Sequence, residues 1–262
     1  MVTEIIQKWY GKIGFSNSYD EEFYKALETY EIDPDAKLET YDINCEDGKK
    51  NFLYFLYFCE ETEKIYNEIG IGKKILFDTL QDFIYWLDIW SKIKGELHLG
   101  QLVWMREILS AKIFRLGRLQ FCLAKHYRCQ KNENQNNVIA CHIPAGEPLD
   151  SKECIKSFDF ARDFFSRFYP EYHWEKFICH SWLLGEELVD ILGENSNIVK
   201  FQKLFTIEEQ IESDSILHYV FGENINRDDV KNLDAKSGLA KKVKELMCDG
   251  AVFHVGSGYI NR

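Results

Sequence analysis

The stretch from Asn137 to Asp150 reads NVIACHIPAGEPLD, and it predicts a buried strand that ends abruptly just before a helix. Its first half is apolar and β-type, which is typical of a strand inside a sheet. Pro144 lacks a backbone donor, so the strand must lose a neighbour or bulge at that point. Gly146 allows a ligand to approach the backbone because no β-carbon is in the way. The stretch therefore predicts a place where a sheet opens beside a helix N-terminus.

The second part of the chain alternates between strand-like and helix-like segments around this stretch. Asp150 is placed to cap a helix, and Glu153 three residues later can reach back to it. We expect strands at 115–124, 138–143, 176–184, 198–205 and 251–260, a polar turn at 131–137, and helices at 150–168, 185–192, 215–221 and 237–248. Because helices separate most of the strands, the sheet should carry helices on both faces.

The first part of the chain reads as helical throughout. Apolar residues recur at three- and four-residue steps near 20–30, 45–69, 73–94 and 102–113. The pattern changes near residues 110–115 without a flexible linker, so the two parts should pack closely. We therefore predict an α+β protein, in which an all-helical N-terminal domain over 1–112 precedes a mixed sheet with helices on both faces over 113–262.

Composition narrows the class of protein. The 262 residues are 45% hydrophobic and carry a formal net charge of −11, which disfavours binding to nucleic acid or to an anionic membrane surface. No run of about 18 apolar residues predicts a membrane span, and the first residues do not resemble a signal peptide. The eight cysteines include no C-x-x-C pair, so reduced thiols in a cytoplasmic protein are the expectation.

The loop that follows the quoted strand leaves two interpretations open. A strand, a tight loop and a helix N-terminus form a generic anion site, since free backbone N–H groups and the helix dipole both favour negative charge. Glu147 and Asp150 place carboxylates where a phosphate would lie, and the glycine spacing of nucleotide-binding loops is absent. The same residues are also compatible with an ordinary Pro/Gly turn.

Four segments carry a resemblance to a known family. They are His142–Leu149 (HIPAGEPL), Cys179–Leu184 (CHSWLL), Ile198–Phe205 (IVKFQKLF) and His254–Gly258 (HVGSG). In their order and spacing they resemble bacterial acyltransferase domain-containing proteins, which join an N-acyltransferase N-terminal helical domain to a GNAT-like C-terminal domain. The resemblance spans essentially the whole chain, although the usual Gln/Arg-x-x-Gly-x-Gly/Ala loop is not present.

The resemblance implies a fold and a cofactor. The second domain would have the GNAT-like sheet, in which strands 138–143 and 177–184 splay apart to admit the pantetheine arm of acyl-coenzyme A. The pyrophosphate would meet the loop before the next helix. The residues expected to bind the cofactor are Ile143, Ala145, Gly146, Glu147 and Ser151.

Candidate catalytic and substrate-binding residues lie on the same segments. His180 and Trp182 are two apart on an expected strand and so share a face, whereas Cys179 faces the other way and is expected to be an inert buried thiol. A neutral histidine suits a general base that takes a proton from an ammonium group, so His142 and His180 are the catalytic candidates. Trp182 and His254 are the candidates for binding the acceptor. Each histidine is equally compatible with a satisfied place in the core.

Three functions remain open at this stage. The first is an acyl-CoA-dependent N-acyltransferase, in which an amine acceptor attacks the thioester directly. The second is a non-catalytic binding module that keeps the GNAT fold. The third is a metal-dependent hydrolase that uses a cluster of His142, His180 and His254, with Glu147 as the base. The first is preferred, with no metal and with small-molecule donor and acceptor as partners, while the acceptor, the acyl length and the oligomeric state are not given by the sequence.

Overall fold

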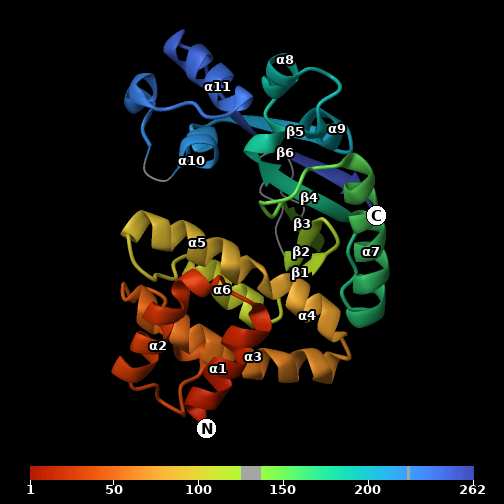
Figure 1. Cartoon of the computed structure of the whole chain (residues 1–262). Coiled ribbons are helices and arrows are strands. Elements are labelled where there is room, and N and C mark those ends of the chain that lie inside the picture. Colours follow the sequence, from red (N-terminus) through yellow and green to blue (C-terminus); the bar gives the residue numbers. More distant parts are fainter. Residues whose placement is uncertain (125–136, 223–224) are drawn as a thin grey trace.

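The computed structural model describes residues 1–124, 137–222 and 225–262. Most of the predicted polar turn at 131–137 lies outside these residues. Helices of the first 110 residues form one body, and a twisted sheet with further helices forms a second body above it (Figure 1). The prediction of a helical N-terminal part followed by a mixed sheet is confirmed.

The first body is built around one long central helix. Its helices are α1 (Val2–Ile13), α2 (Asp20–Thr29), α3 (Gly48–Ile69), α4 (Lys73–Leu80), α5 (Asp82–Lys94) and α6 (Leu102–Leu109). The Asp47 side chain caps α3 by accepting a hydrogen bond from the amide of Lys50, and Gly70 ends it with a φ of 84°. The expected run over 73–94 is two helices that meet at Gln81, and α1 was not predicted.

The sheet of the second body contains six strands in the described residues. They are β1 (Ile113–Leu116), β2 (Leu119–Ala124), β3 (Val138–His142), β4 (Lys176–Ser181), β5 (Thr206–Glu212) and β6 (His254–Asn261). Their order is β1-β2-β3-β4-β6-β5, and only the central pair β3–β4 is parallel. A parallel pair needs a crossover connection, which here is a helix.

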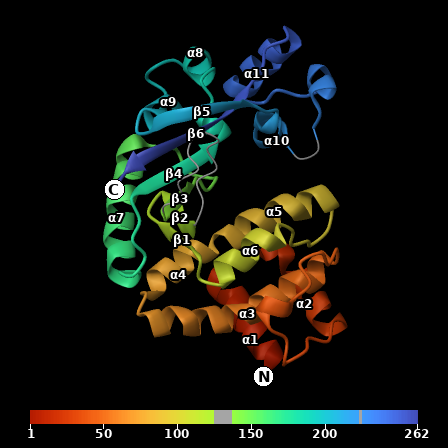
Figure 2. The same ribbon diagram turned by 180° about the vertical axis from the view of Figure 1, so that it is seen from behind.

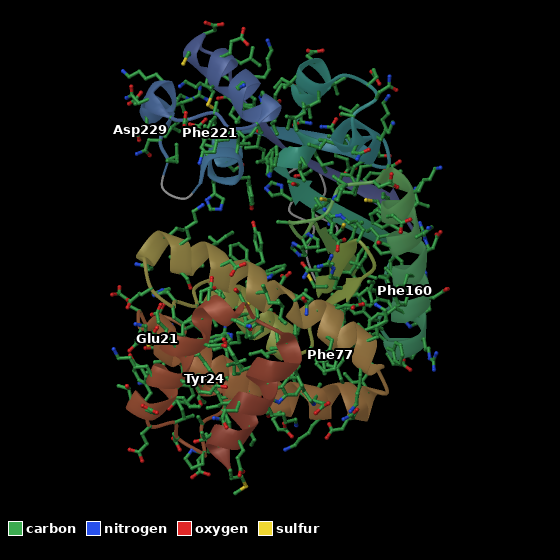
Figure 3. The ribbon with its side chains drawn as sticks, in the orientation of Figure 1. Glu21, Tyr24, Phe77, Phe160, Phe221 and Asp229 are labelled. Atoms are coloured by element: carbon green, nitrogen blue, oxygen red, sulfur yellow. The ribbon has the colours of Figure 1, made fainter. Side chains whose placement is uncertain are left out.

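That crossover is α7 (Ser151–Phe168), and it covers one face of the sheet. Its Phe158 ring lies 5.5 Å from the ring of Phe121 on β2 and 5.0 Å from that of Phe177 on β4. Phe160, two residues on, points away from the sheet and is 43% exposed (Figure 3). The remaining helices of this body are α8 (Leu188–Leu192), α9 (Asn197–Gln202), α10 (Ser215–Phe221) and α11 (Gly238–Cys248).

The two bodies share one hydrophobic core. Phe114 of β1 lies between the bodies, with its ring 5.8 Å from that of Tyr66 on α3 and 4.8 Å from that of Phe164 on α7. On the sheet face opposite α7, Trp104 of α6 packs on His142 of β3. α5 and α10 face each other on the side away from α7 (Figures 1 and 2). The helical body therefore covers part of the face that α7 leaves open.

Two segments differ from the sequence prediction. The expected strand 115–124 is a hairpin, because Gly117 turns the chain with a φ of 75° between β1 and β2. The expected strand 198–205 is mostly the helix α9, which Ser196 caps by accepting from the amide of Val199, and the edge strand β5 follows it. Short apolar runs fit helix and strand periods about equally well, which explains the second error. No helix in the described residues is long and apolar enough to span a membrane.

Candidate active site

The central pair of strands separates where the sequence predicts that the sheet opens. β3 and β4 are in register over three residue pairs only, and the last of these is Ala140 with Ile178. Both strands continue beyond that point with their outer neighbours: β3 pairs with β2 as far as His142, and β4 pairs with β6 as far as Ser181. The facing edges of β3 and β4 therefore part while each strand stays anchored on its other edge.

The loop after β3 leads directly into the capped N-terminus of α7. Pro144 is buried, whereas Ala145, Gly146 and Glu147 are exposed, and Gly146 has a φ of 96° that favours glycine. Asp150 caps the helix by accepting from the amides of Lys152 and Glu153, as predicted. Glu153 does not reach back to complete a capping box, because its carboxylate pairs with Lys156. Ser151 is the first residue of α7, so its amide lies among the unpaired donors of a helix start.

His180 lies on the face of β4 opposite α7, beside the separated strands. Register pairs it with Ser257 of β6, and its Nδ1 is 2.7 Å from the Ser257 hydroxyl oxygen. The imidazole is exposed although Ser257 is fully buried, so a buried hydroxyl holds one edge of an exposed ring. Cys179 faces the other way and is 2% exposed, as expected for alternating strand residues.

His142 lies on the same face as His180 but in different surroundings. Its Nε2 is 3.4 Å from the Cys122 sulfur, and its ring meets the Trp104 ring edge-on at 4.8 Å. Trp104 is itself held by a 2.9 Å hydrogen bond from its Nε1 to the buried Asp82 carboxylate. Burial lowers the pKa of His142 to about 4. His142 is therefore neutral at pH 7 and a weak base.

The structure does not bring His254 to these two histidines. His254 begins β6 three residues before Ser257, so its side chain is on the other face of the sheet. There its Nδ1 lies 3.2 Å from one Glu187 carboxylate oxygen, and its amide donates to the other at 2.8 Å. Among the described residues, no group of three His, Cys, Asp or Glu side chains could hold a metal ion. The proposed His142, His180 and His254 metal cluster is therefore wrong.

Trp182 does not continue the strand that carries His180. The strand ends at Ser181, and Trp182 begins a single 3₁₀ turn over Trp182–Leu184. This turn presses on β6: a β-carbon at Gly256 would lie 2.3 Å from the Leu184 carbonyl oxygen. The Trp182 ring stacks on that of Tyr219 of α10, with centroids 5.8 Å apart. Trp182 follows His180 by two residues, and its position comes from the turn rather than from strand alternation.

Two residues that shape the site were not singled out from the sequence. Ser257 fixes the His180 ring, and a signal for it was present, since it lies between two glycines in the HVGSG segment. Arg118 lies in the β1–β2 turn and donates to carbonyls of the loop after β3. No local pattern marks Arg118, because its partners lie some 26 to 30 positions away in the sequence.

The comparison with family models agrees with this geometry. Residues 113–260 match the model described as "GNAT-like C-terminal domain", which confirms the resemblance inferred from the four segments. No match was found among curated proteins.

The solved structures to which this chain is similar include acyltransferase complexes. One, described as an acyltransferase in complex with decanoyl-CoA, is 27% identical with a TM-score of 0.70 and aligns over 80% of this chain and 64% of its own. This chain thus spans less than two thirds of that neighbour. A second, in complex with decanoyl-CoA and teicoplanin, is 22% identical with a TM-score of 0.79 over 98% and 88% of the two chains. A third, in complex with CoA and 10C-teicoplanin, is 21% identical with a TM-score of 0.78 over 97% and 87%. At these two lower identities the likeness shows the fold.

Proposed function

Because the chain belongs to the family of proteins with a GNAT-like C-terminal domain, we propose that it is an acyl-CoA-dependent N-acyltransferase. The observation that carries the proposal is that β3 and β4 separate after the pair Ala140 and Ile178. The loop that contains Gly146 follows β3, and the exposed His180 lies on β4. A donor that enters between the strands brings its thioester to one end of this separation and its phosphates to the other. The 27% identical neighbour with decanoyl-CoA bound supports the same class of donor.

The donor would use backbone groups more than side chains. Beyond the last β3–β4 pair, the facing strand edges can hydrogen-bond to the pantetheine amides as an added strand does. The pyrophosphate would meet the loop amides of Ala145, Gly146 and Glu147 and the start of α7 at Ser151, where the helix dipole favours an anion. Ile143 would line the passage between these two regions. Coenzyme A is thus a co-substrate that carries the acyl group.

The transfer itself needs an accepted proton and a stabilised oxyanion. His180 takes a proton from the acceptor ammonium group, which frees the nitrogen lone pair to attack the thioester carbonyl carbon. Backbone N–H groups at the freed edge of β4 polarise the carbonyl oxygen as negative charge develops on it. The new C–N bond forms, the C–S bond breaks, and coenzyme A leaves as the thiolate, which takes the remaining extra proton from the nitrogen and departs as the thiol. Ser257 keeps the ring of His180 oriented throughout.

The acceptor would approach from the face that carries His180. Trp182 and Tyr219 present stacked rings there, and aromatic faces suit an acceptor with flat apolar surface. His142 as a second catalytic residue stays a prediction, and its low pKa makes it a weak base. His254 as an acceptor-binding residue also stays a prediction, which its contacts on the other face do not favour.

Two experiments test the proposal. Isothermal titration of the protein with CoA, decanoyl-CoA and short acyl-CoAs should show binding of the thioesters, and absence of binding by every one of them would overturn the proposal. Release of free thiol from decanoyl-CoA should then be followed with a panel of amines, including a glycopeptide, against water alone. A protein that binds the donors but never transfers to any amine would favour the non-catalytic binding module.

The variant H180Q tests the role of the base. General-base removal costs about 10²- to 10⁴-fold in rate, so the turnover of H180Q should fall by that range while donor affinity stays within about twofold. H173Q is the matched control, because exposed His173 precedes β4 at the end opposite His180. Equal turnover of H180Q and the wild-type protein would remove His180 from the mechanism.

A further inference from the structure

Arg118 joins three carbonyl groups of the loop between β3 and α7. Its Nη1 donates to the Pro144 carbonyl at 2.8 Å, its Nη2 to the Glu147 carbonyl at 2.7 Å, and its Nε to the Pro148 carbonyl at 2.9 Å. The residue is only 7% exposed. A buried guanidinium group is costly to desolvate, so its three short hydrogen bonds to one loop are a built feature of the fold.

Arg118 is also fixed to the helix that the loop leads into. Its amide donates to the Ser157 hydroxyl of α7 at 2.8 Å, and that hydroxyl donates to the Glu153 carbonyl. The preceding Gly117 could not carry a side chain, because a β-carbon there would lie 2.8 Å from the Ser157 oxygen. The hairpin turn, the loop and the first turns of α7 are therefore tied into one unit.

The directions of two of these carbonyls, those of Pro144 and Pro148, determine the directions of the amides that follow them. In a planar trans peptide, the carbonyl of one residue and the N–H of the next point in opposite directions. Because the Pro144 and Pro148 carbonyls point at Arg118, the N–H groups of Ala145 and Leu149 point away from it. In the described parts of the chain neither amide donates to a protein acceptor. Two backbone donors are thus turned away from Arg118, one on exposed Ala145 at the start of the loop and one on buried Leu149 at its end.

The carboxylate that would oppose an anion at this loop is drawn aside. Glu147 Oε2 lies 3.1 Å from Nη2 of Arg115 on β1, whose side chain is 13% exposed. The ion pair neutralises Glu147 and turns its charge toward the hairpin. The second carboxylate of this region, Asp150, accepts from the amides of Lys152 and Glu153 at the start of α7.

From these contacts we propose that Arg118 is a positioning residue for the phosphate groups of the acyl donor. It does not touch the donor; it sets the directions of the Ala145 and Leu149 amides, which do. This sequence lacks the usual glycine-rich phosphate loop, whose own backbone conformation directs its amides. Here the side chain of a buried arginine directs the amides instead, because it holds the carbonyl groups of the loop. The inference rests on the proposed function, since it names how the same donor site is ordered.

The test compares two donors in three variants. Dissociation constants of decanoyl-CoA and of decanoyl-pantetheine, which lacks the pyrophosphate, are measured by calorimetry for the wild-type protein, R118M, R118K and R167M. R118M should bind decanoyl-CoA about 10- to 100-fold more weakly, because the loop must be ordered on binding, and should bind decanoyl-pantetheine within about threefold of wild type. R118K keeps the charge but not the fork of donors, so an intermediate loss is expected. R167M removes an exposed arginine from the other end of α7 and should match the wild type.

The outcomes separate this inference from the proposed function. Failure of the wild-type protein to bind any of the acyl-CoAs overturns both. Wild-type binding that R118M and R118K preserve within twofold overturns the inference alone. Equal losses for the two donors would show a general structural role and would also overturn it. If R118M does not fold, R118K decides in the same way, and hydrogen exchange of the peptide 143–150 should be faster in it than in R167M.

Discussion

The burial of His142 makes the stability of this protein depend on pH in a way that one substitution removes. The pKa of His142 falls from 6.5 to about 4 on folding, because the folded protein withdraws its ring from water. Between those values the unfolded chain binds the proton that the folded protein excludes, so stability decreases as the pH falls from 7 toward 4. At pH 5 this single histidine should cost about 2 kcal/mol of the stability present at pH 7.

The variant H142Q keeps a polar group near Cys122 but has no proton to gain. Urea unfolding followed by circular dichroism at pH 7 and pH 5 should show that the wild-type protein loses about 2 kcal/mol more than H142Q between the two values. Carboxylates and the other histidines titrate in both proteins and cancel in the comparison. H173Q, which alters an exposed histidine, should behave as the wild type does. If the wild-type protein and H142Q lose the same stability within about 0.5 kcal/mol, the argument from burial is refuted.

Three further substitutions test separate parts of the site. G256A should lower the free energy of unfolding, measured by urea denaturation, by at least about 2 kcal/mol, because the added β-carbon would lie 2.3 Å from the Leu184 carbonyl oxygen. S257A should lower turnover about tenfold at unchanged donor affinity, since His180 loses its orienting hydroxyl; a change in donor affinity instead would contradict that role. W182A should raise the KM for the acceptor about 3- to 10-fold and leave the donor dissociation constant alone, and an unchanged acceptor KM would place the acceptor elsewhere.

The fold was predictable where the sequence pattern is local. A few neighbouring residues were enough to predict three features: the cap of α7 at Asp150, the end of β3 before Pro144 and the apolar stripe of α3. The errors arose where short segments fit two periods, as in α9, or where one apolar run hides a tight turn, as at Gly117. In both cases packing against other elements, which no local pattern contains, decides between the alternatives.

The positions of the site residues were predictable only where they follow from the alternation of residues along a strand. Alternation placed His180 and Cys179 on opposite faces, as observed, but the register of β3 with β4 was needed to put His142 on the face of His180. Their different surroundings could not be foreseen, because Trp104 comes from the helical body and Ser257 from the last strand. Long-range contacts of this kind assign His142 to a dry, neutral environment and leave His180 accessible.

The side chains on the two faces of the separated strands also differ, and this difference determines from which face the proposed donor can be attacked. Cys141 and Cys179 follow the last β3–β4 pair on the α7 side, and both are buried. Burial, together with the neighbouring Cys179 thiol, raises the pKa of Cys141 well above its ordinary value, so the Cys141 thiol stays neutral and unreactive. On the opposite side the next residues are His142 and His180, one neutral and one exposed. In the proposed complex, a thioester between the strands is therefore closed off from α7, and the acceptor attacks its carbonyl carbon from the face of His180.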